Sequence, residues 1–289
     1  MIAETKEKDW QSQLRSQNSE QAKLDVLRNE IDNVDNALLA MLYQRFTLTR
    51  HVGEIKAKFA ARAKSPDIYR PERELRVLNR LEEQSYGKLP PHLVYALWRQ
   101  IFSFSSQEQG AQPLGYLCND DENLETWMRI HFGISCQSKM YRDTQNMLSE
   151  LSDGNIGIAL LPNPKRIDWW SSLALGNTPN VFVVGSVPSQ NTPPLILARR
   201  PFDDTPEQNA RISSWLTFER DENTSLYSFQ DYLKENNVVF ELITSERAPR
   251  AILLEIQDFW QEDHKHLRTI RDNYTLRNMK ILGHSFSEP

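Results

Sequence analysis

The sequence is poor in cysteine, with two in 289 residues, which excludes a disulfide framework. Neither belongs to a closely spaced pair that could hold a metal. No apolar run approaches the roughly 20 residues of a transmembrane helix, and the charged start, MIAETKEKDW, lacks the apolar core of a signal peptide. The net charge of −5 argues against a general nucleic-acid or acidic-membrane binder. We therefore expect a globular, cytoplasmic protein without metal or other cofactor and with neither nucleic acid nor membrane as a partner.

Length and pattern together divide the chain into several parts. At roughly 150 residues per domain, a chain of 289 residues favours two domains, with room for three small ones. The fold class that we expect is all-α followed by α/β. The boundaries follow changes of composition and period: a polar tail over 1–20, a helical region over 21–109, a linker over 110–113, and α/β segments over 114–205 and 206–289.

Residues 24–59 predict one uninterrupted helix without proline and with a single glycine. Its apolar side chains recur in steps of four and three, the spacing of a coiled-coil seam: Leu27, Ile31, Val34, Leu38, Met41, Leu48, Val52, Ile55 and Phe59. At 1.5 Å per residue this helix is about 54 Å long, too long for a small compact monomer. It needs a partner along its length, and a second copy of the same helix is the simplest one.

Prolines and changes of period mark the remaining elements. Pro71 suits the first turn of a helix over 71–84, and another helix is expected over 91–109. Beyond the linker, four apolar stretches predict buried strands, with helices near 122–132 and 143–152 between the first two: 114–118, 156–161, 181–187 and 195–198. A last segment predicts strand, helix, two paired strands, helix and strand, in that order, over 213–218, 225–236, 238–246, 251–258, 262–273 and 279–284.

One position of the helical seam carries a charge. Arg45 stands midway between Met41 and Leu48, where an apolar side chain is due. Since burying an unpaired guanidinium is costly, Arg45 sets register, snorkels outward, or faces an anionic ligand inside a helical bundle. Lys56 favours the ligand, because it lies three turns further on nearly the same face, about 16 Å away. Two long cations at that separation leave room for a small dianion.

Other polar residues on the three helices extend this candidate site. Arg28, at the edge of the seam, is too far from Arg45 to share a site with it on one helix, but a partner's copy can reach it in an antiparallel dimer. The second and third helices add Arg73, Glu74, Ser105 and Gln109. The set contains no His, no Cys and no serine–base pair, which argues against hydrolysis and covalent catalysis.

Three stretches on these helices carry a family resemblance: LRNEIDNVDNALLAMLYQRFTLTRHVGEIK, YRPERELRVL and LWRQIFSFSSQEQ. They resemble the all-helical chorismate mutases, and most of all the N-terminal mutase module of the bifunctional chorismate mutase–prephenate dehydratases. The resemblance covers roughly residues 22–109. It implies an intertwined all-α homodimer that converts chorismate to prephenate.

The resemblance also implies a role for each polar residue. It implies that the substrate carboxylates are bound by Arg45 and by Arg28 of the partner subunit, with Arg73 beside them and Ser105 near a carboxylate. Lys56 and Gln109 would contact the ether oxygen, and Glu74 the ring hydroxyl. The reaction is an intramolecular 3,3-pericyclic rearrangement, which needs no nucleophile and no proton transfer. What accelerates it is holding the compact conformer and stabilising charge as the C–O bond breaks. Because the amide of Gln109 needs no protonation, we expect a flat pH–rate profile near neutrality.

Beyond the linker the likeness continues in altered form. About 87 residues, 114–200, resemble one lobe, periplasmic-binding-like in fold, of a dehydratase domain that has two. The family's glycine-rich turn is Cys118-Asn119-Asp120-Asp121-Glu122 in this chain, and Asn191-Thr192-Pro193-Pro194 stands nearest to its Thr-Arg-Phe triplet. Backbone without glycine cannot approach an anion closely, and carboxylates repel it. We therefore expect no prephenate dehydratase activity.

Residues 213–289 resemble the ACT regulatory domain, and Ser245-Glu246-Arg247 keep part of its Glu-Ser-Arg-Pro region. Its effector loop normally contains glycine, whereas residues 221–226 have none. We therefore favour a packing or dimerisation module over a phenylalanine-binding one. His264 and His266 are two apart in a predicted helix, so they are expected on different faces and not as a metal pair.

Three interpretations of function follow. The leading one is a chorismate mutase of the shikimate pathway, in aromatic amino acid biosynthesis. Glu74 is compatible with a hydroxyl or an ammonium, so the same scaffold suits 4-amino-4-deoxychorismate or an isochorismate-type substrate as well. The third interpretation is a non-catalytic regulatory or binding protein built on the mutase dimer.

Overall fold

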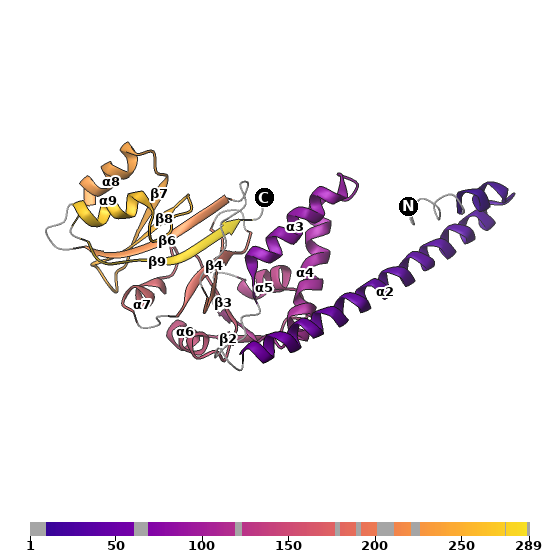
Figure 1. The fold of residues 1–289 in the computed structure, drawn as a ribbon, viewed down its shortest axis with the longest axis horizontal. Helices are drawn as coiled ribbons and strands as arrows, with labels where there is room; N and C mark the ends of the chain where they lie inside the picture. Colours follow the sequence, from indigo (N-terminus) through magenta and orange to yellow (C-terminus); the bar gives the residue numbers. More distant parts are fainter. Residues whose placement is uncertain are drawn as a thin grey trace. The chain divides into compact units, whose positions relative to one another are not determined.

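The computed structural model describes residues 10–60, 69–118, 123–176, 180–188, 192–200, 211–220, 226–274 and 276–287. It is a mixed helix and sheet fold (Figure 1) that divides into two compact units, residues 1–56 and residues 57–289. In the described part of the chain, no helix combines the length and hydropathy that crossing a membrane requires. Some predicted features lie outside the described residues: 1–9 of the polar tail, 119–122 of the turn without glycine, Asn191, and 221–225 of the loop.

The first unit is built on the long helix α2, which runs over Glu20–Ala60. Ser19 caps its start, since its Oγ accepts a hydrogen bond from the backbone N–H of Ala22 at 3.1 Å. The helix predicted over 24–59 is thereby confirmed, and a further helical stretch covers residues 10–16. The seam side chains keep 45–62 % of their surface exposed: Ile31, Val34, Leu38, Met41, Leu48, Val52 and Ile55.

The second unit begins with two helices that confirm the predicted pair. Helix α3 covers Pro71–Ser85 and α4 covers Pro91–Glu108, each with proline in its first turn. Tyr86, in the left-handed conformation, ends α3. The two helices contact each other, and Tyr95 donates a hydrogen bond from its hydroxyl to Glu82 at 2.6 Å.

Within the described residues, nine strands form one sheet in the order β2-β1-β3-β5-β4-β9-β6-β8-β7. Its first half consists of β1 (Leu114–Leu117), β2 (Ser138–Tyr141), β3 (Ile158–Leu161), β4 (Phe182–Ser186) and β5 (Leu195–Ala198). Strand β1 runs parallel to β2 and β3, while β5 is antiparallel to β3 and β4. The helices that go with them are α5 (Leu124–Phe132), α6 (Thr144–Asp153) and α7 (Trp170–Ala174).

The second half of the sheet has the element order that the sequence predicts. It comprises β6 (Arg211–Arg220), α8 (Leu226–Glu235), β7 (Phe240–Thr244), β8 (Ala251–Ile256), α9 (Lys265–Asn273) and β9 (Leu276–Ser287). All its strand pairs are antiparallel. Helices α8 and α9 cover one face (Figure 1), where Phe229 and Leu267 are buried with Phe218 and Leu254. The opposite face shares a core with the first half, in which Trp215 and Leu253 belong to the same buried cluster as Leu160.

The two halves join where β4 runs parallel to β9, at the pair Val183 and Gly283. A Cβ on Gly283 would overlap the backbone of Val183, and its φ of 135° is one that other residues rarely adopt. Two side chains reinforce the junction. Ser186 donates a hydrogen bond to the carbonyl of Phe286 at 2.9 Å, and Trp215 Nε1 donates to Ser285 Oγ at 2.8 Å.

Besides the helical stretch over 10–16, which lies in the predicted polar tail, two elements have no counterpart among the predictions. Strand β2 was missed because only its last residue, Tyr141, is buried, so Lys139 and its neighbours show no apolar alternation. Helix α7 has five residues, too few to show a helical period.

The expectation that His264 and His266 point to different faces is wrong. Helix α9 begins at Lys265, and His264 precedes it with extended backbone (φ −60°, ψ 137°), so a rule for residues two apart in a helix does not apply. Both imidazoles stack on the indole of Trp260, and their ring centroids lie 5.4 Å apart. His266 Nδ1 also shares a hydrogen bond with the hydroxyl of Tyr232 at 2.9 Å. In the part of the chain that the structure describes, no group of three or more His, Cys, Asp or Glu could hold a metal ion.

Candidate functional site

Part of the predicted mutase set lies on α2, in the first unit. Arg28 is exposed and forms an ion pair with Asp25 one turn before it, with an Nη1–Oδ1 distance of 3.4 Å. Arg45 and Lys56 are half-buried. The backbone carbonyl of Arg45 accepts a hydrogen bond from Thr49 Oγ1 at 2.9 Å. The long side chains of this set therefore project from one continuous helix, as the sequence predicts.

The rest of the set lies on α3 and α4, in the second unit. Arg73 is exposed on α3. Ser105 is buried on α4 and donates its hydroxyl to the carbonyl of Ile101 at 2.6 Å. Gln109 ends α4, and its Nε2 donates to the carbonyl of Ser105 at 3.1 Å. Its Oε1 is buried and has no hydrogen-bond partner among the described residues. The structure thus brings Ser105 and Gln109 together at the end of α4.

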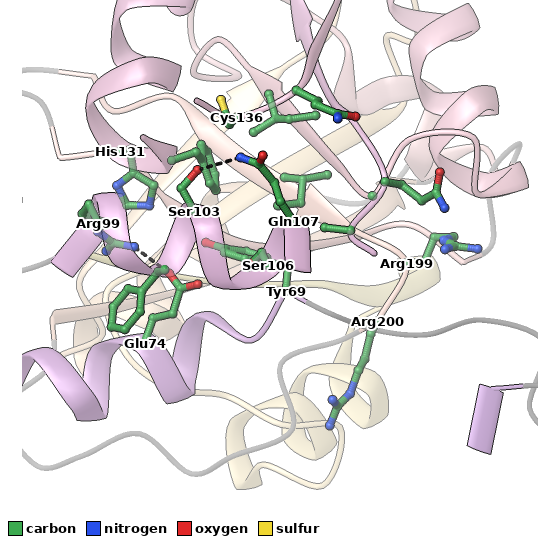
Figure 2. A pocket seen from close by; sticks show the side chains of 18 residues that line it. Tyr69, Glu74, Arg99, Ser103, Ser106, Gln107, His131, Cys136, Arg199 and Arg200 are labelled. Atoms are coloured by element: carbon green, nitrogen blue, oxygen red, sulfur yellow. Dashed lines mark hydrogen bonds and ion pairs between the residues drawn. The ribbon is translucent and has the colours of Figure 1, made fainter. Parts of the chain in front are cut away.

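Glu74 does not join that pair but lines a cavity of about 260 Å³ in the second unit (Figure 2). Helices α4 and α5 form one side of it, and the starts of β1 and β3 the other. Ser105 and Gln109 do not line it. Much of the lining is apolar, from Phe102, Leu114, Phe132 and Ile158.

One end of the cavity holds a buried ion pair. Glu74 accepts a hydrogen bond from Arg99 Nη1 at 2.7 Å, and only 16 % and 7 % of the two side chains are exposed. Burial raises the pKa of Glu74 above its ordinary value, although Arg99 opposes the shift. His131 lies beside them, and burial first and the charge of Arg99 second hold its pKa well below the ordinary value. His131 is therefore a neutral imidazole at pH 7.

Tyr69 adds an unsatisfied group to this end. Its hydroxyl is buried, and within the described ranges it has no hydrogen-bond partner. Burial raises its pKa well above the ordinary value, so the group is a neutral donor at physiological pH. A buried hydroxyl without a partner is costly, which leaves a place for a ligand atom or a water.

Arg199 and Arg200, which follow β5, line the opposite end of the cavity (Figure 2). The guanidinium of Arg199 lies so close to Gly154 that a Cβ there would overlap it. No described residue forms a hydrogen bond or ion pair with the Arg199 side chain. The cavity therefore offers a guanidinium at the end opposite the Glu74–Arg99 pair.

Sequence reasoning missed Tyr69, Arg99 and His131. A signal for Arg99 was present, because it is the only Lys, Arg, Asp or Glu in α4 before Glu108. A charged side chain is almost never fully buried unless it is paired, so a charge on an apolar helix that packs inside the fold predicts a partner. Tyr69 and His131 gave no such signal, since their environment depends on elements far apart in the chain.

Comparison with known proteins bears on the helical residues. Residues 27–110 match the family described as chorismate mutase type II. The helical region is therefore similar to chorismate mutase type II domains. This agrees with the resemblance seen in the sequence, and it extends over α2, α3 and α4.

Several relatives carry the name bifunctional chorismate mutase/prephenate dehydratase. A bifunctional chorismate mutase/prephenate dehydratase of Pseudomonas aeruginosa is 26 % identical over 144 residues, which cover 50 % of this chain and 40 % of that protein. One of Neisseria gonorrhoeae is 37 % identical over 106 residues, 37 % of this chain and 27 % of the relative. The 144 aligned residues exceed the length of the mutase match, so this similarity extends beyond the helical region. The matched parts span less than half the length of these relatives.

Solved structures give more distant similarities. One is described as GqqA, a novel type of quorum quenching acylases, with a TM-score of 0.46, 16 % identity, and coverage of 61 % of this chain and 95 % of that chain. Another is a prephenate dehydratase from Streptococcus mutans, with a TM-score of 0.43, 11 % identity, and coverage of 61 % and 98 %.

The Ser245-Glu246-Arg247 motif of the C-terminal half has a packing role at its first residue. Ser245 is buried, donates its hydroxyl to Asp168 just before α7, and accepts a hydrogen bond from the backbone of Ala248 at 2.8 Å. These bonds tie the end of β7 to the segment before α7.

Proposed function

We propose that this protein is a homodimeric chorismate mutase that converts chorismate to prephenate. The observation that carries the proposal is the extent of the family match, from residue 27 to residue 110. That match encloses every member of the predicted set, from Arg28 to Gln109. The set suits a small dianion, because a guanidinium group binds a planar carboxylate in a bidentate manner, with two parallel hydrogen bonds.

Acceleration of the rearrangement rests on differential binding. Lys56 and Gln109 donate to the ether oxygen, where negative charge grows as the C–O bond breaks, and such contacts lower the barrier more than they strengthen substrate binding. Gln109 Nε2 already donates to the carbonyl of Ser105. Turning this amide toward the substrate exchanges one hydrogen bond for another, so the motion is inexpensive.

The dimer part of the proposal rests on α2. Its seam side chains are exposed in the single chain, and their steps of four and three match a helix partner. Arg28 completes the substrate site from the partner subunit. The C-terminal half offers a second dimer contact, as an ACT-like module would.

We also propose that dehydratase activity is absent. Thr192-Pro193-Pro194 replaces the catalytic triplet expected by resemblance, and the first half of the sheet corresponds to one lobe rather than two. A site that needs a cleft between lobes has no second wall in such a chain.

The experiment that tests the proposal follows the loss of chorismate absorbance with the purified full chain. Phenylpyruvate is then assayed with and without acid treatment, because acid converts prephenate to phenylpyruvate. Phenylpyruvate only after acid supports a mutase without dehydratase, whereas phenylpyruvate without acid contradicts the second part. No loss of chorismate contradicts the first part and directs the assay to 4-amino-4-deoxychorismate, isochorismate or a binding role.

Arg45→Ala separates catalysis from helix register, with Arg50→Ala on the same helix as the matched control. Loss of turnover in Arg45→Ala with unchanged circular dichroism and oligomeric state supports the substrate role. A change of oligomeric state with turnover retained supports the register role instead.

A further inference from the structure

We propose that the cavity beside Glu74 is a second ligand site, which binds a small carboxylate with an aromatic body. The cavity lies in one compact unit and is formed by α4, α5, the linker, and the starts of β1 and β3. Its volume of about 260 Å³ is just below the ~300–1,000 Å³ typical of sites for drug-sized ligands. A molecule of one ring and a short acidic side chain fits this size.

The charges of the lining favour an anion. Glu74 is the single acidic side chain of the described lining, and Arg99 already pairs with it. Arg199 adds a further guanidinium group at the other end. Since no described residue neutralises the Arg199 side chain, a ligand carboxylate can take both of its outer N–H groups in a two-pronged contact.

The middle of the cavity favours an aromatic body. Phe102 and Phe132 present rings from α4 and α5, and Leu114 and Ile158 present aliphatic side chains from the strands. Aromatic rings pack edge-to-face or offset against one another with more stabilisation than their buried area alone provides. A ligand ring between these side chains removes apolar surface from water on both sides.

Tyr69 marks the far end of such a ligand. Its buried hydroxyl lacks a partner in the described structure, whereas Arg99 and Glu74 beside it hold each other. A small polar substituent on the ligand ring, such as a hydroxyl, would satisfy it. The ligand is therefore oriented with its carboxylate at Arg199 and any ring hydroxyl at Tyr69.

The position of the cavity sets it apart from the usual ligand site of an α/β sheet. Such sheets bind ligands at the carboxyl ends of their parallel strands. Leu114 and Ile158 are the first residues of β1 and β3, and Gln137 directly precedes β2, so this cavity lies at the amino ends. Ser105 and Gln109 do not line it.

Binding is tested by isothermal titration calorimetry on the full chain, with 3-phenylpropionate as the probe. The neutral analogue 3-phenylpropanol lacks the carboxylate, and acetate lacks the ring, so both should bind far more weakly. Arg199→Met should weaken 3-phenylpropionate about 10- to 100-fold, the worth of a hydrogen bond to a charged group. Arg268→Met, an exposed arginine on α9, is the matched control and should change nothing.

A second variant fills the cavity without touching its charges. Ser106→Leu should abolish 3-phenylpropionate binding while circular dichroism stays that of the wild type. The proposal is overturned by no saturable binding to the wild type, by equal affinity of Arg199→Met and wild type, or by binding that survives Ser106→Leu.

Because Glu74 belongs to both sites, an occupant of the cavity should change mutase turnover; this step rests on the proposed function. Saturating 3-phenylpropionate should alter kcat/KM for chorismate in the wild type and not in Arg199→Met. Unchanged turnover at saturation contradicts the coupling. Calorimetry needs no turnover, so a chain without mutase activity that still binds the probe refutes the proposed function and leaves the ligand site standing.

Discussion

Helix α2 and the sheet differ in the burial of their apolar side chains. Along α2, the seven seam residues from Ile31 to Ile55 keep 45–62 % of their surface exposed, whereas Leu197 and Leu254 in the sheet are fully buried. Both faces of the sheet are covered by other parts of the chain, whereas the apolar stripe of α2 is exposed. The sheet therefore completes its core within one chain, whereas the stripe of the long helix would be buried only in the proposed dimer.

The largest effect is expected where the sheet is most tightly constrained. Gly283→Ala puts a Cβ into the backbone of Val183 at an unfavourable φ, so we expect a loss of about 4 kcal/mol or more in the free energy of unfolding. Urea denaturation measures it. Gly185→Ala in β4, where the new Cβ meets Ile196 at 3.4 Å, is the control and should cost far less. Equal stabilities would show that the junction between the halves is dispensable.

The next effect concerns the buried ion pair of the second unit. Glu74→Ala leaves the guanidinium of Arg99 buried without its carboxylate, which we expect to cost about 3 kcal/mol. The exposed Glu83 on the same helix provides the control, Glu83→Ala, which should be within about 0.5 kcal/mol of the wild type. The comparison of the two variants is again made by urea denaturation. A small cost for Glu74→Ala would mean that Arg99 reaches solvent.

For α2 the expected effect is on assembly. Leu38→Lys places a charge in the seam and should weaken the proposed dimer about 100-fold, because the charge would be buried between helices. Asn36→Lys, on the opposite side of the same helix, should leave the dimer intact. Sedimentation equilibrium distinguishes them. If the wild type is already monomeric at the concentration used, α2 needs no second chain, and the contrast between α2 and the sheet has no basis.

The smallest effect is the response of the second unit to acid. Burial lowers the pKa of His131, and also of His264, His266 and His284. In each case the unfolded chain takes up a proton near pH 6.5 while the folded chain does not, so stability falls as the pH falls below about 6.5. Glu74, whose pKa is raised, acts in the opposite direction at lower pH.

His131→Gln tests the share of one group in this response. The variant cannot titrate, so its loss of stability between pH 7 and pH 5.5, followed by urea denaturation, should be smaller than that of the wild type. An identical slope would mean that His131 is protonated without penalty in the folded chain.

Much of the fold was predictable because its signals are local. The steps of four and three in α2, and the prolines that open α3 and α4, each act within a few residues. Strand β2 was not predictable, since it is held by pairing with β1 rather than by an apolar pattern of its own. The environment of His264 was misjudged for a similar reason, because it depends on where α9 begins and on Trp260.

The candidate site residues also divide into those with a local sequence signal and those that only tertiary packing brings together. Arg45 was predicted because a charge interrupts the apolar period of one helix, and Lys56 because it lies three turns further on nearly the same face. The cavity joins Arg99 on α4, His131 on α5 and Arg199 after β5, and only tertiary packing brings these three together. A local pattern therefore predicts a site made by one helix face and misses one made by three elements.

The order of strands in the sheet has a consequence for biosynthesis. Strand β9 is the last of the strands to leave the ribosome, yet it lies between β4 and β6 and so joins the two halves. Until residues 276–287 emerge, β4 and β6 both keep an open edge, and open edges are where nascent chains pair wrongly. A stop codon before Gly283 would thus leave an open edge on both halves. Early termination should therefore yield an aggregating product rather than a stable first half.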